Sequence, residues 1–346
     1  MATAQIHYVW RAIDIHPPEG QKSAAYAIGG GTPYGMYETG NINDHVGVKW
    51  PRLVPELIDL TPEGHIWSEI RGADGNKQAG KARSNPPESF TSGAVWYGTS
   101  ESFQSLNEDD IGPTVHAIDG NLIVGEARFP DGPYAHAALW LNEDPDSLLN
   151  LHPTEAGSQG WSRAYATDGF WQGGTATLPG PGFHKATLWK GSATNYINMH
   201  PPGAKDSEIR GMAIGTQVGK MLVWETGDDH AVVWHDTAES WIDMHPSFHP
   251  GANSYMFATT GDIHVGRSNG RAGIWFGDDP DSFHDLQQYA PWAASSTAYD
   301  VEVYNGKLYV VGSAGNGKAH ATVWIGTPVV ADDPAVRKTP RGIDRK

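Results

Sequence analysis

The segment HATVW at residues 320–324 is one copy of a short apolar run that recurs along the chain and ends in tryptophan. Related copies carry a histidine just upstream, as in HAALW (136–140), HKATLW (184–189) and HAVVW (230–234). Successive tryptophans of the series are roughly 40 to 50 residues apart, a period typical of propellers and other repeat architectures. The series comprises Trp10, Trp50, Trp96, Trp140, Trp189, Trp234, Trp275 and Trp324.

A second position of the repeat keeps a constant distance to the tryptophan. We call it the anchor, and it is Ser23, Ser68, Pro113, Ser162, Ser207, Ser254 and Ser296 in the successive repeats. From each anchor to the next repeat tryptophan there are 27 or 28 residues, except in the sixth repeat, where there are 21. Two positions that hold one spacing argue against a chance similarity.

The residues between these positions have the pattern of short strands. A glycine-centred turn leads to a second glycine, as in DGNLIVG (119–125) and TGDIHVG (260–266), and the apolar residues alternate with period two. We expect strand a to start at the anchor, strand b to end at the second glycine, and strand c to end at the tryptophan. Strand d is the following apolar run, as in LLNLHP (148–153). Seven such units predict an all-β, seven-bladed β-propeller of four-stranded antiparallel blades.

The two ends of the chain predict how the ring closes. The last repeat lacks a strand d, whereas residues 6–15 form a strand-d run with no repeat before it. We therefore expect this N-terminal strand to complete the last blade, which leaves only short edges. The predicted domain is 1–328, and the basic segment 329–346 is expected to be disordered.

The composition of the chain limits the classes of partner that it can bind. The chain of 346 residues has a formal net charge of −16, which argues against nucleic acid and anionic membranes as partners. It has no cysteine, so disulfides and thiolate metal sites are excluded. No apolar run reaches the length of a transmembrane helix, and residues 1–5 lack signal-peptide character. A secreted and a cytoplasmic location both remain open, as does the oligomeric state.

The combination of anchor serine, glycine turn, V-G pair, HAxxW and closing apolar run resembles the HAF repeat of bacterial, often extracellular, proteins. The resemblance covers nearly the whole chain and implies a repeat β-fold, but it carries over no catalytic residue. The chain departs from that repeat in two ways. The residue after His-Ala is Ala, Val or Thr rather than Phe, and strand d often ends in His-Pro rather than Gly.

Most repeated residues are expected to be structural. The tryptophans should pack between blades, and the HAxxW histidines (His136, His230, His320) should bind buried backbone carbonyls. The His-Pro histidines (His16, His152, His200, His245) should cap turns. The acidic segments at 142–147 and 277–282 resemble calcium ligands, but their Asp, Pro and Ser residues are also those that hairpin turns need.

One position of strand a varies where the rest of the repeat is constant. Three residues after each anchor the chain has Tyr26, Arg71, His116, Tyr165, Arg210, Phe257 and Tyr299. The innermost strand of a propeller blade lines the central channel, so these seven side chains should meet at the axis. Unlike residues at equivalent positions suit one asymmetric site.

The residue types predict roles for this site. Arg71 and Arg210 could clamp an anion, with Tyr26 and Phe257 also contacting the substrate. His116, Tyr165 and Tyr299 are the candidate acid–base residues.

Residues near the start of strand a add to the prediction. Glu126 is the candidate partner of His116 in acid–base chemistry, and Trp67 and Trp161 should bind substrate at an entrance on this side. The alternative is that large side chains merely fill the channel, with the arginines paired to Glu69 and Glu208.

The predicted function is a single axial site for an anionic or sugar-like ligand, with lyase-like acid–base chemistry. The alternatives are a lectin with sites between blades and a protein-interaction scaffold. The sequence contains no P-loop or HExxH motif, and we predict no cofactor. A metal site of His116, Glu126 and His136 is conceivable, but no spacing demands it, and we predict no metal.

Overall fold

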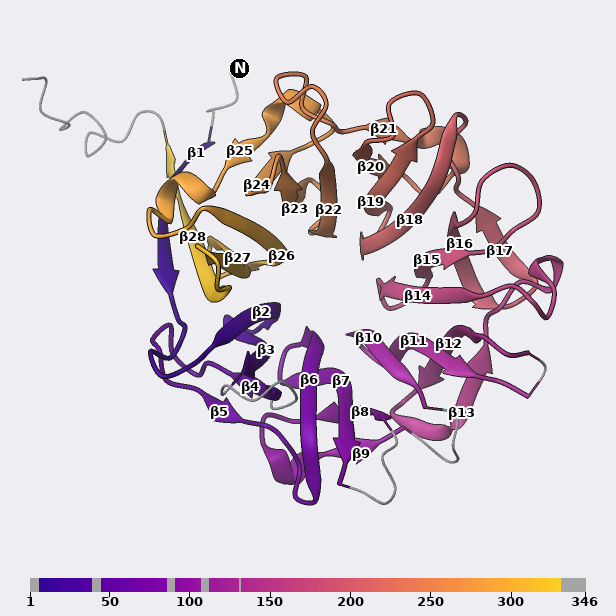
Figure 1. The fold of residues 1–346 in the computed structure, drawn as a ribbon, viewed down its shortest axis with the longest axis horizontal. Helices are drawn as coiled ribbons and strands as arrows, with labels where there is room; N and C mark the ends of the chain where they lie inside the picture. The colour runs from indigo at the N-terminus through magenta and orange to yellow at the C-terminus, as the bar shows by residue number, and fades with distance from the viewer. Residues whose placement is uncertain (1–5, 39–44, 86–90, 107–111, 131, 331–346) are drawn as a thin grey trace, which may run out of the picture.

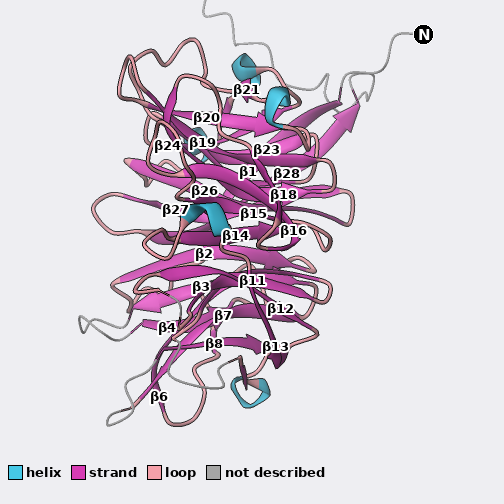
Figure 2. Ribbon diagram, turned by 90° about the vertical axis from the view of Figure 1, so that its right-hand side faces the viewer, coloured by secondary structure: helices cyan, strands magenta, loops and turns pink. Residues whose placement is uncertain are grey.

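The structure, a computed structural model, describes residues 6–38, 45–85, 91–106, 112–130 and 132–330. Within these ranges it contains seven sheets, each of four antiparallel strands, arranged around one axis (Figure 1). In side view the body of the molecule consists of strands, and helix is confined to single turns in the connections (Figure 2). The predicted seven-bladed propeller is therefore confirmed.

Blades 1 to 6 run outward from the axis in chain order, and in blade 7 the N-terminal strand takes the outermost place. Blades 1 and 2 are formed by β2 (Lys22–Gly29), β3 (Thr32–Glu38), β4 (His45–Lys49), β5 (Ile58–Asp59), β6 (His65–Asp74), β7 (Lys77–Ser84), β8 (Thr91–Trp96) and β9 (Gln104–Ser105). Blades 3 and 4 are formed by β10 (Thr114–Asp119), β11 (Leu122–Arg128), β12 (Ala135–Leu141), β13 (Asp144–Asn150), β14 (Ser162–Thr167), β15 (Gln172–Ala176), β16 (Lys185–Ser192) and β17 (Asn195–Asn198).

The remaining blades follow the same order. Blades 5 and 6 are formed by β18 (Ala204–Ala213), β19 (Thr216–Val223), β20 (Asp229–Trp234), β21 (Ile242–Asp243), β22 (Ser254–Thr259), β23 (Ile263–Ser268), β24 (Arg271–Phe276) and β25 (His284–Asp285). Blade 7 is formed by β26 (Ser295–Tyr304), β27 (Lys307–Gly315), β28 (His320–Val330) and β1 (Ile6–Asp14).

The connections hold short 3₁₀ turns, which are η1 (Ser100–Ser102), η2 (Thr154–Ala156), η3 (Ala238–Ser240), η4 (Pro280–Ser282) and η5 (Gln287–Tyr289). In the described ranges, no helix has the length and apolar character needed to span a membrane.

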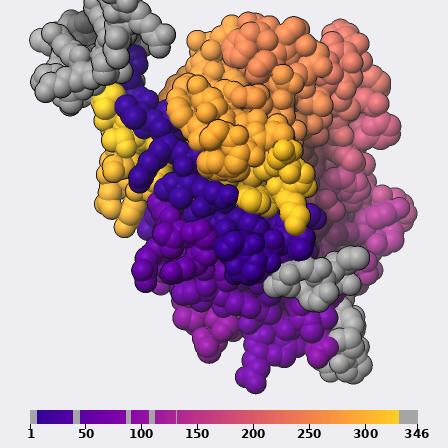
Figure 3. Space-filling model, turned by 60° about the vertical axis from the view of Figure 1, so that its left-hand side comes forward, coloured from indigo at the N-terminus to yellow at the C-terminus, as the bar shows by residue number. Residues whose placement is uncertain are grey.

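The N-terminal strand closes the ring as predicted. β1 pairs with β28 antiparallel, with Trp10 opposite Gly326, and the two segments lie side by side in Figure 3. Because β28 continues to Val330, the last blade extends two residues past the predicted boundary at 328. The rest of the predicted tail, 331–346, lies outside the described residues.

The glycine of strand b marks a bulge in strand a rather than the end of strand b. β11 continues to Arg128, so the prediction that strand b stops at Gly125 is wrong, and the other six blades show the same extension. A Cβ on Gly125 would lie 1.9 Å from the carbonyl oxygen of Thr114 on the inner strand. Only glycine tolerates so close an approach of two backbones.

Seven tryptophans form the contacts between blades. Trp50, Trp96, Trp140, Trp189, Trp234, Trp275 and Trp324 are all 0% exposed. Trp140, for example, packs against Ala79 and Val95 of the preceding blade. Trp10 was expected at the same repeat position, but it lies on the outermost strand of blade 7, since residues 6–14 supply strand d. The seven buried indoles therefore fix the fit between neighbouring blades.

Anchor serines and His-Pro histidines form a repeated link between blades, which we call the Ser–His clasp. The histidine Nδ1 lies 2.7 to 2.9 Å from the serine Oγ in the pairs His16–Ser23, His152–Ser162, His200–Ser207 and His245–Ser254. At the blade 4–5 junction, Ala186 N–H of the preceding blade donates to Ser207 Oγ at 2.9 Å. His200 Nε2 lies 3.0 Å from the carbonyl oxygen of Ala204, so both ring nitrogens are used.

The HAxxW histidines have a partner that the sequence did not predict. His230 and His320 bond the carboxylates of Asp243 and Asp14 at 2.8 Å, not backbone carbonyls. Their rings stack on clasp histidines, with ring centroids 4.2 and 4.1 Å apart. These histidines, which lie on the third strand of their blades, therefore link the clasp to an aspartate of the outermost strand.

Candidate functional site

The seven variable residues of strand a meet at the axis, and we call them the axial ring. They are Tyr26, Arg71, His116, Tyr165, Arg210, Phe257 and Tyr299. In every blade the register between the two inner strands shifts at this residue, which is the extra residue of a β-bulge. A bulge re-aims the side chain that it carries. All seven line one cavity with a volume of about 350 Å³, so the ring does not fill the channel.

Aromatic and cationic contacts divide the axial ring into two arcs. In the first arc the guanidinium of Arg71 lies 4.8 Å from the ring centroid of Tyr26. Tyr299 follows it, with ring centroids 5.1 Å from Tyr26 and 5.6 Å from Phe257.

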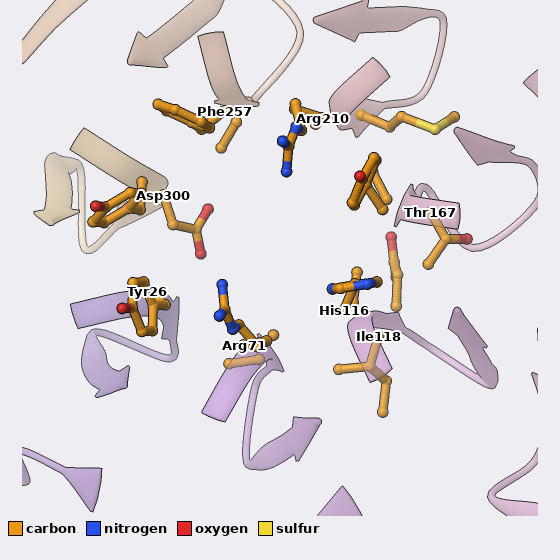
Figure 4. Close-up of a pocket in the computed structure, with 18 of the residues that line it drawn as sticks. Tyr26, Arg71, His116, Ile118, Thr167, Arg210, Phe257 and Asp300 are labelled. Atoms are coloured by element: carbon orange, nitrogen blue, oxygen red, sulfur yellow. The ribbon is translucent and has the colours of Figure 1, made fainter. Parts of the chain in front are cut away.

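The second arc is shorter. Arg210 lies 4.2 Å from the ring centroid of Tyr165, and the rings of Tyr165 and His116 are 5.2 Å apart. Figure 4 shows Arg71 and Arg210 entering the cavity from opposite sides. The cavity therefore has aromatic walls with a guanidinium at one end of each arc.

Each axial arginine also has a carboxylate partner. Arg71 Nη2 lies 2.8 Å from Glu69, and Arg210 Nε lies 2.8 Å from Glu208. These are the ion pairs expected if the arginines only filled the channel. The arginine side chains nevertheless remain 38% and 35% exposed. Pairing therefore fixes the guanidiniums without burying them.

His116 lies between the cavity and a charged pair on the other side of the ring. Its Nε2 is 3.9 Å from Glu126, which pairs with Arg163. Burial lowers the pKa of His116 well below 6.5, and the positive charge of Arg71 lowers it further. His116 is therefore unprotonated at neutral pH and can accept a proton. Glu126 does not line the cavity, so it can act only through His116.

Tyr26 and Tyr165 keep their protons at neutral pH. Burial raises the pKa of both hydroxyls, and for Tyr26 the carboxylate of Glu69 adds to the effect. A buried tyrosine that stays protonated is a hydrogen-bond donor. The second arc therefore pairs a proton acceptor, His116, with a proton donor, Tyr165.

Asp300 is a cavity residue that the sequence analysis missed. Its carboxylate accepts hydrogen bonds from the backbone N–H groups of Ile28 at 2.9 Å and Val301 at 2.8 Å. Burial raises the pKa of Asp300 to about 7 despite these two donors. Figure 4 shows the carboxylate directed into the cavity.

The sequence did contain a signal for this residue. Six blades have alanine or glycine directly after the ring residue, namely Ala27, Gly72, Ala117, Ala166, Gly211 and Ala258. Asp300 occupies that position in blade 7 and is the one charged residue there. A charged residue in a column of small ones marks a departure from the scaffold.

The cavity extends toward the ends of the inner strands, where its lining includes Asp74, Asp119 and Thr167. Burial raises the pKa of Asp119, and the carboxylate of Asp74 contributes. This end is opposite to the predicted entrance at the start of strand a.

The two tryptophans expected at that entrance lie outside the cavity lining. Trp67 packs on His45, with ring centroids 4.6 Å apart, and Trp161 packs on His184 at 4.2 Å. Their role in substrate binding stays a prediction.

In the described part of the chain, no three His, Asp or Glu side chains form a group that could hold a metal ion. His136, a member of the conceivable metal set, instead stacks on His152 with ring centroids 3.8 Å apart. The acidic segment at 142–147 forms the β12–β13 hairpin, in which Asn142 and Glu143 adopt positive φ angles of 55° and 60°.

Comparisons with known proteins add the fold and nothing finer. No family model and no curated protein matches the chain, so the likeness to HAF repeats stays a prediction. The chain is similar to a prolyl endopeptidase structure (TM-score 0.54, 12% identity, 96% of this chain and 50% of the other). It is also similar to puromycin hydrolase, with a TM-score of 0.54 and 12% identity over 91% of this chain and 55% of the other. A third similar structure is the polysaccharide lyase Uly1, with a TM-score of 0.48 and 11% identity over 91% of this chain and 90% of the other. The chain spans about half the length of the first two proteins.

Proposed function

We propose that the axial cavity binds one small sugar-like ligand that carries an acidic group. The observation that carries this proposal is the pair of guanidiniums, Arg71 and Arg210, that enter one cavity from opposite sides. Guanidinium forks match the geometry of carboxylate, sulfate and phosphate oxygens. Because the ring positions do not repeat one residue type around the axis, the cavity offers one site and not several equivalent ones.

The rest of the lining favours a ligand with hydroxyl groups. Tyr26, Tyr165 and Tyr299 present flat faces on which a sugar ring can stack, and Asp300 can accept hydrogen bonds from its hydroxyls. A volume of about 350 Å³ lies at the lower end of small-molecule sites, which are roughly 300–1,000 Å³. The cavity therefore suits about one sugar ring, with any longer chain outside it.

The second arc supports β-elimination as the chemistry of this site. Unprotonated His116 takes the proton from the carbon next to the ligand carboxylate. A carbon–carbon double bond forms as the bond to the leaving oxygen breaks, and Tyr165 gives its phenolic proton to that oxygen. The guanidiniums stabilise the negative charge that develops on the carboxylate.

Isothermal titration tests the binding step. The panel consists of D-glucuronate, D-galacturonate, their disaccharides and the neutral sugars glucose and galactose. We expect one acidic ligand per chain and no comparable binding of the neutral sugars. The double variant Arg71→Lys/Arg210→Lys keeps both charges but removes the forks, and it should bind at least tenfold more weakly. Arg11→Lys, an exposed residue of the outermost strand, is the matched control.

The other outcomes assign other functions. Binding at several equivalent sites, with an affinity that the double substitution leaves unchanged, would indicate a lectin. An absence of binding across the panel would overturn the proposal and favour a protein-interaction scaffold.

Ultraviolet absorbance of the new double bond tests the chemistry separately. Product formation by the wild type that is lost in both His116→Ala and Tyr165→Phe supports elimination. Binding without product means that the site only binds.

A further inference from the structure

A second pocket lies between blades 6 and 7, on the side where the inner strands begin. It has a volume of about 260 Å³ and is lined by Arg267, Ser295, Ser296, Thr297, Ser313, Ala314, Gly315, Gly317, Lys318 and Ala319. It shares no lining residue with the axial cavity. Its lining includes one arginine, one lysine and several hydroxyl side chains.

Arg267 occupies a repeat position whose charge is paired in other blades. The position directly follows the strand-b glycine, and blades 2 and 5 have Lys81 and Lys220 there. Lys81 lies 3.6 Å from Glu69, and Lys220 lies 3.0 Å from Asp229.

Arg267 lacks such a partner. Among the described residues, no carboxylate lies within ion-pair distance of its guanidinium, and its buried Nε has no hydrogen-bond partner. Its side chain lies over the face of Tyr255, whose ring centroid is 5.8 Å away. A buried guanidinium nitrogen without a hydrogen-bond partner carries an energetic cost that a bound anion would offset.

The residues around the arginine explain why it is unpaired. Within blade 6, Tyr255 lies opposite Arg267, whereas in blade 2 Glu69 lies opposite Lys81. In blade 7 the positions that hold charges elsewhere are Thr297 on β26 and Ser313 on β27, which are paired in the sheet. Both side chains line the pocket, and within the described ranges neither hydroxyl has a hydrogen-bond partner. Lys318 at the rim donates to Gln21 at 2.9 Å and is otherwise exposed. One arginine, one lysine and two hydroxyl side chains without hydrogen-bond partners therefore line one small pocket.

We propose that this pocket binds a tetrahedral oxyanion, phosphate or sulfate, either free or as a monoester. Arg267 supplies the charge and a two-pronged donor, Thr297 and Ser313 donate hydroxyl hydrogen bonds, and Lys318 neutralises the outer oxygens. The site is independent of the proposed axial site. It differs from a lectin site repeated between blades because the hydroxyl pair and the unpaired arginine occur together at one junction.

Isothermal titration with inorganic phosphate and then with inorganic sulfate, in low-salt buffer at pH 7.5, tests the proposal. We expect saturable binding at one site per chain. Charge-assisted hydrogen bonds contribute about 1.5–3 kcal/mol, so Arg267→Gln should weaken binding by about tenfold to a hundredfold. Glucose 1-phosphate and glucose sulfate form a second arm. Tighter binding of an ester than of the free ion would identify the monoester as the ligand.

Two control variants separate this site from the axial cavity. Because the axial guanidiniums can also hold an oxyanion, the titration is repeated in Arg71→Lys/Arg210→Lys, where the site that depends on Arg267 should keep its affinity, as it should in the exposed Arg11→Gln. If Arg267→Gln does not fold, the double variant Thr297→Val/Ser313→Ala tests the site instead, and its affinity for phosphate should be several-fold lower. The proposal is overturned if the wild type shows no saturable binding of either ion, or if removal of both the guanidinium and the hydroxyls leaves the affinity unchanged.

Discussion

The clasp histidines and His116 have the same side chain in opposite settings. His200 uses both ring nitrogens, one toward Ser207 and one toward a backbone carbonyl, and three further blade junctions repeat this Ser–His pair. His116 occurs once, faces a cavity, and has no hydrogen-bond partner at its buried Nε2. A serine 2.7 Å from a histidine resembles a nucleophile with its base. Here the serine accepts a backbone N–H from the preceding blade, so the pair holds blades together.

This difference gives a rule for the molecule. Side chains that recur from blade to blade make hydrogen bonds between blades or fill the space between sheets. Side chains that vary at the axis face one cavity. Substitutions in the first set should therefore change stability, and substitutions in the second set should change ligand binding.

Trp140→Ala should have the largest effect on stability. The indole is fully buried between blades 2 and 3, and removal of such a side chain costs about 3–5 kcal/mol. Urea unfolding of the variant should show this loss in the free energy of unfolding. Phe257→Ala, which removes an aromatic side chain of the axial ring, should cost clearly less. Equal losses would break the distinction between scaffold and ring.

His264→Gln should remove a large part of the acid sensitivity. Burial lowers the pKa of His264 from 6.5 to about 4 in the folded protein. Between pH 6.5 and 4 the unfolded chain therefore binds more protons, so stability is complete above pH 6.5 and is lost as the pH falls toward 4. The loss amounts to roughly 3 kcal/mol for this residue.

The repeat supplies the substitution for this test, because blades 2, 4 and 5 have Gln78, Gln172 and Gln217 at the equivalent position. Unfolding at a series of pH values should give a flatter profile for the glutamine variant than for the wild type. Identical profiles would show that His264 does not titrate as described.

His200→Ala and His116→Ala should separate the two settings of histidine. Loss of the clasp hydrogen bonds should lower the free energy of unfolding by about 1–2 kcal/mol, with ligand binding at the axis unchanged. His116→Ala should do the reverse and weaken binding of the acidic ligand with a smaller effect on stability. Thermal unfolding of both variants measures the change in stability, and titration measures the change in ligand affinity. The same change in both quantities for both variants would contradict it.

Asp300→Asn should have the smallest effect. The pKa of Asp300 is about 7, so its carboxylate gains charge between pH 6 and 8 and repels an anionic ligand. The affinity of the wild type for an acidic sugar should therefore fall several-fold over this range. The asparagine variant should show no such trend, and a parallel trend in both proteins would assign it to another group.

The sequence predicted the repeated features well because a repeat presents each of them several times. The anchor-to-tryptophan spacing placed the blades, and residues 6–15 predicted the closing strand. The axial ring followed from the variation at one strand position, although the bulge that re-aims Arg71 and its equivalents was not recognised. The glycine of strand b was its signal, since a carbonyl approaches that Cα too closely for any side chain.

Other features depend on neighbours that a repeat does not specify. The stacking of His320 on His16 and the isolation of Arg267 arise between blades. Asp300 was missed because a single charged residue in a column of alanine and glycine was not compared across blades. The end of the channel at which the cavity lies depends on which side chains fill the other end, and only the structure gives that arrangement.

A crystal structure of the protein soaked with D-glucuronate tests the central claim most directly. We predict one molecule at the axis, with its carboxylate between Arg71 and Arg210 and its ring against Tyr165 or Tyr299. Density for the sugar between blades at several junctions, with the axial cavity free of it, would contradict the account.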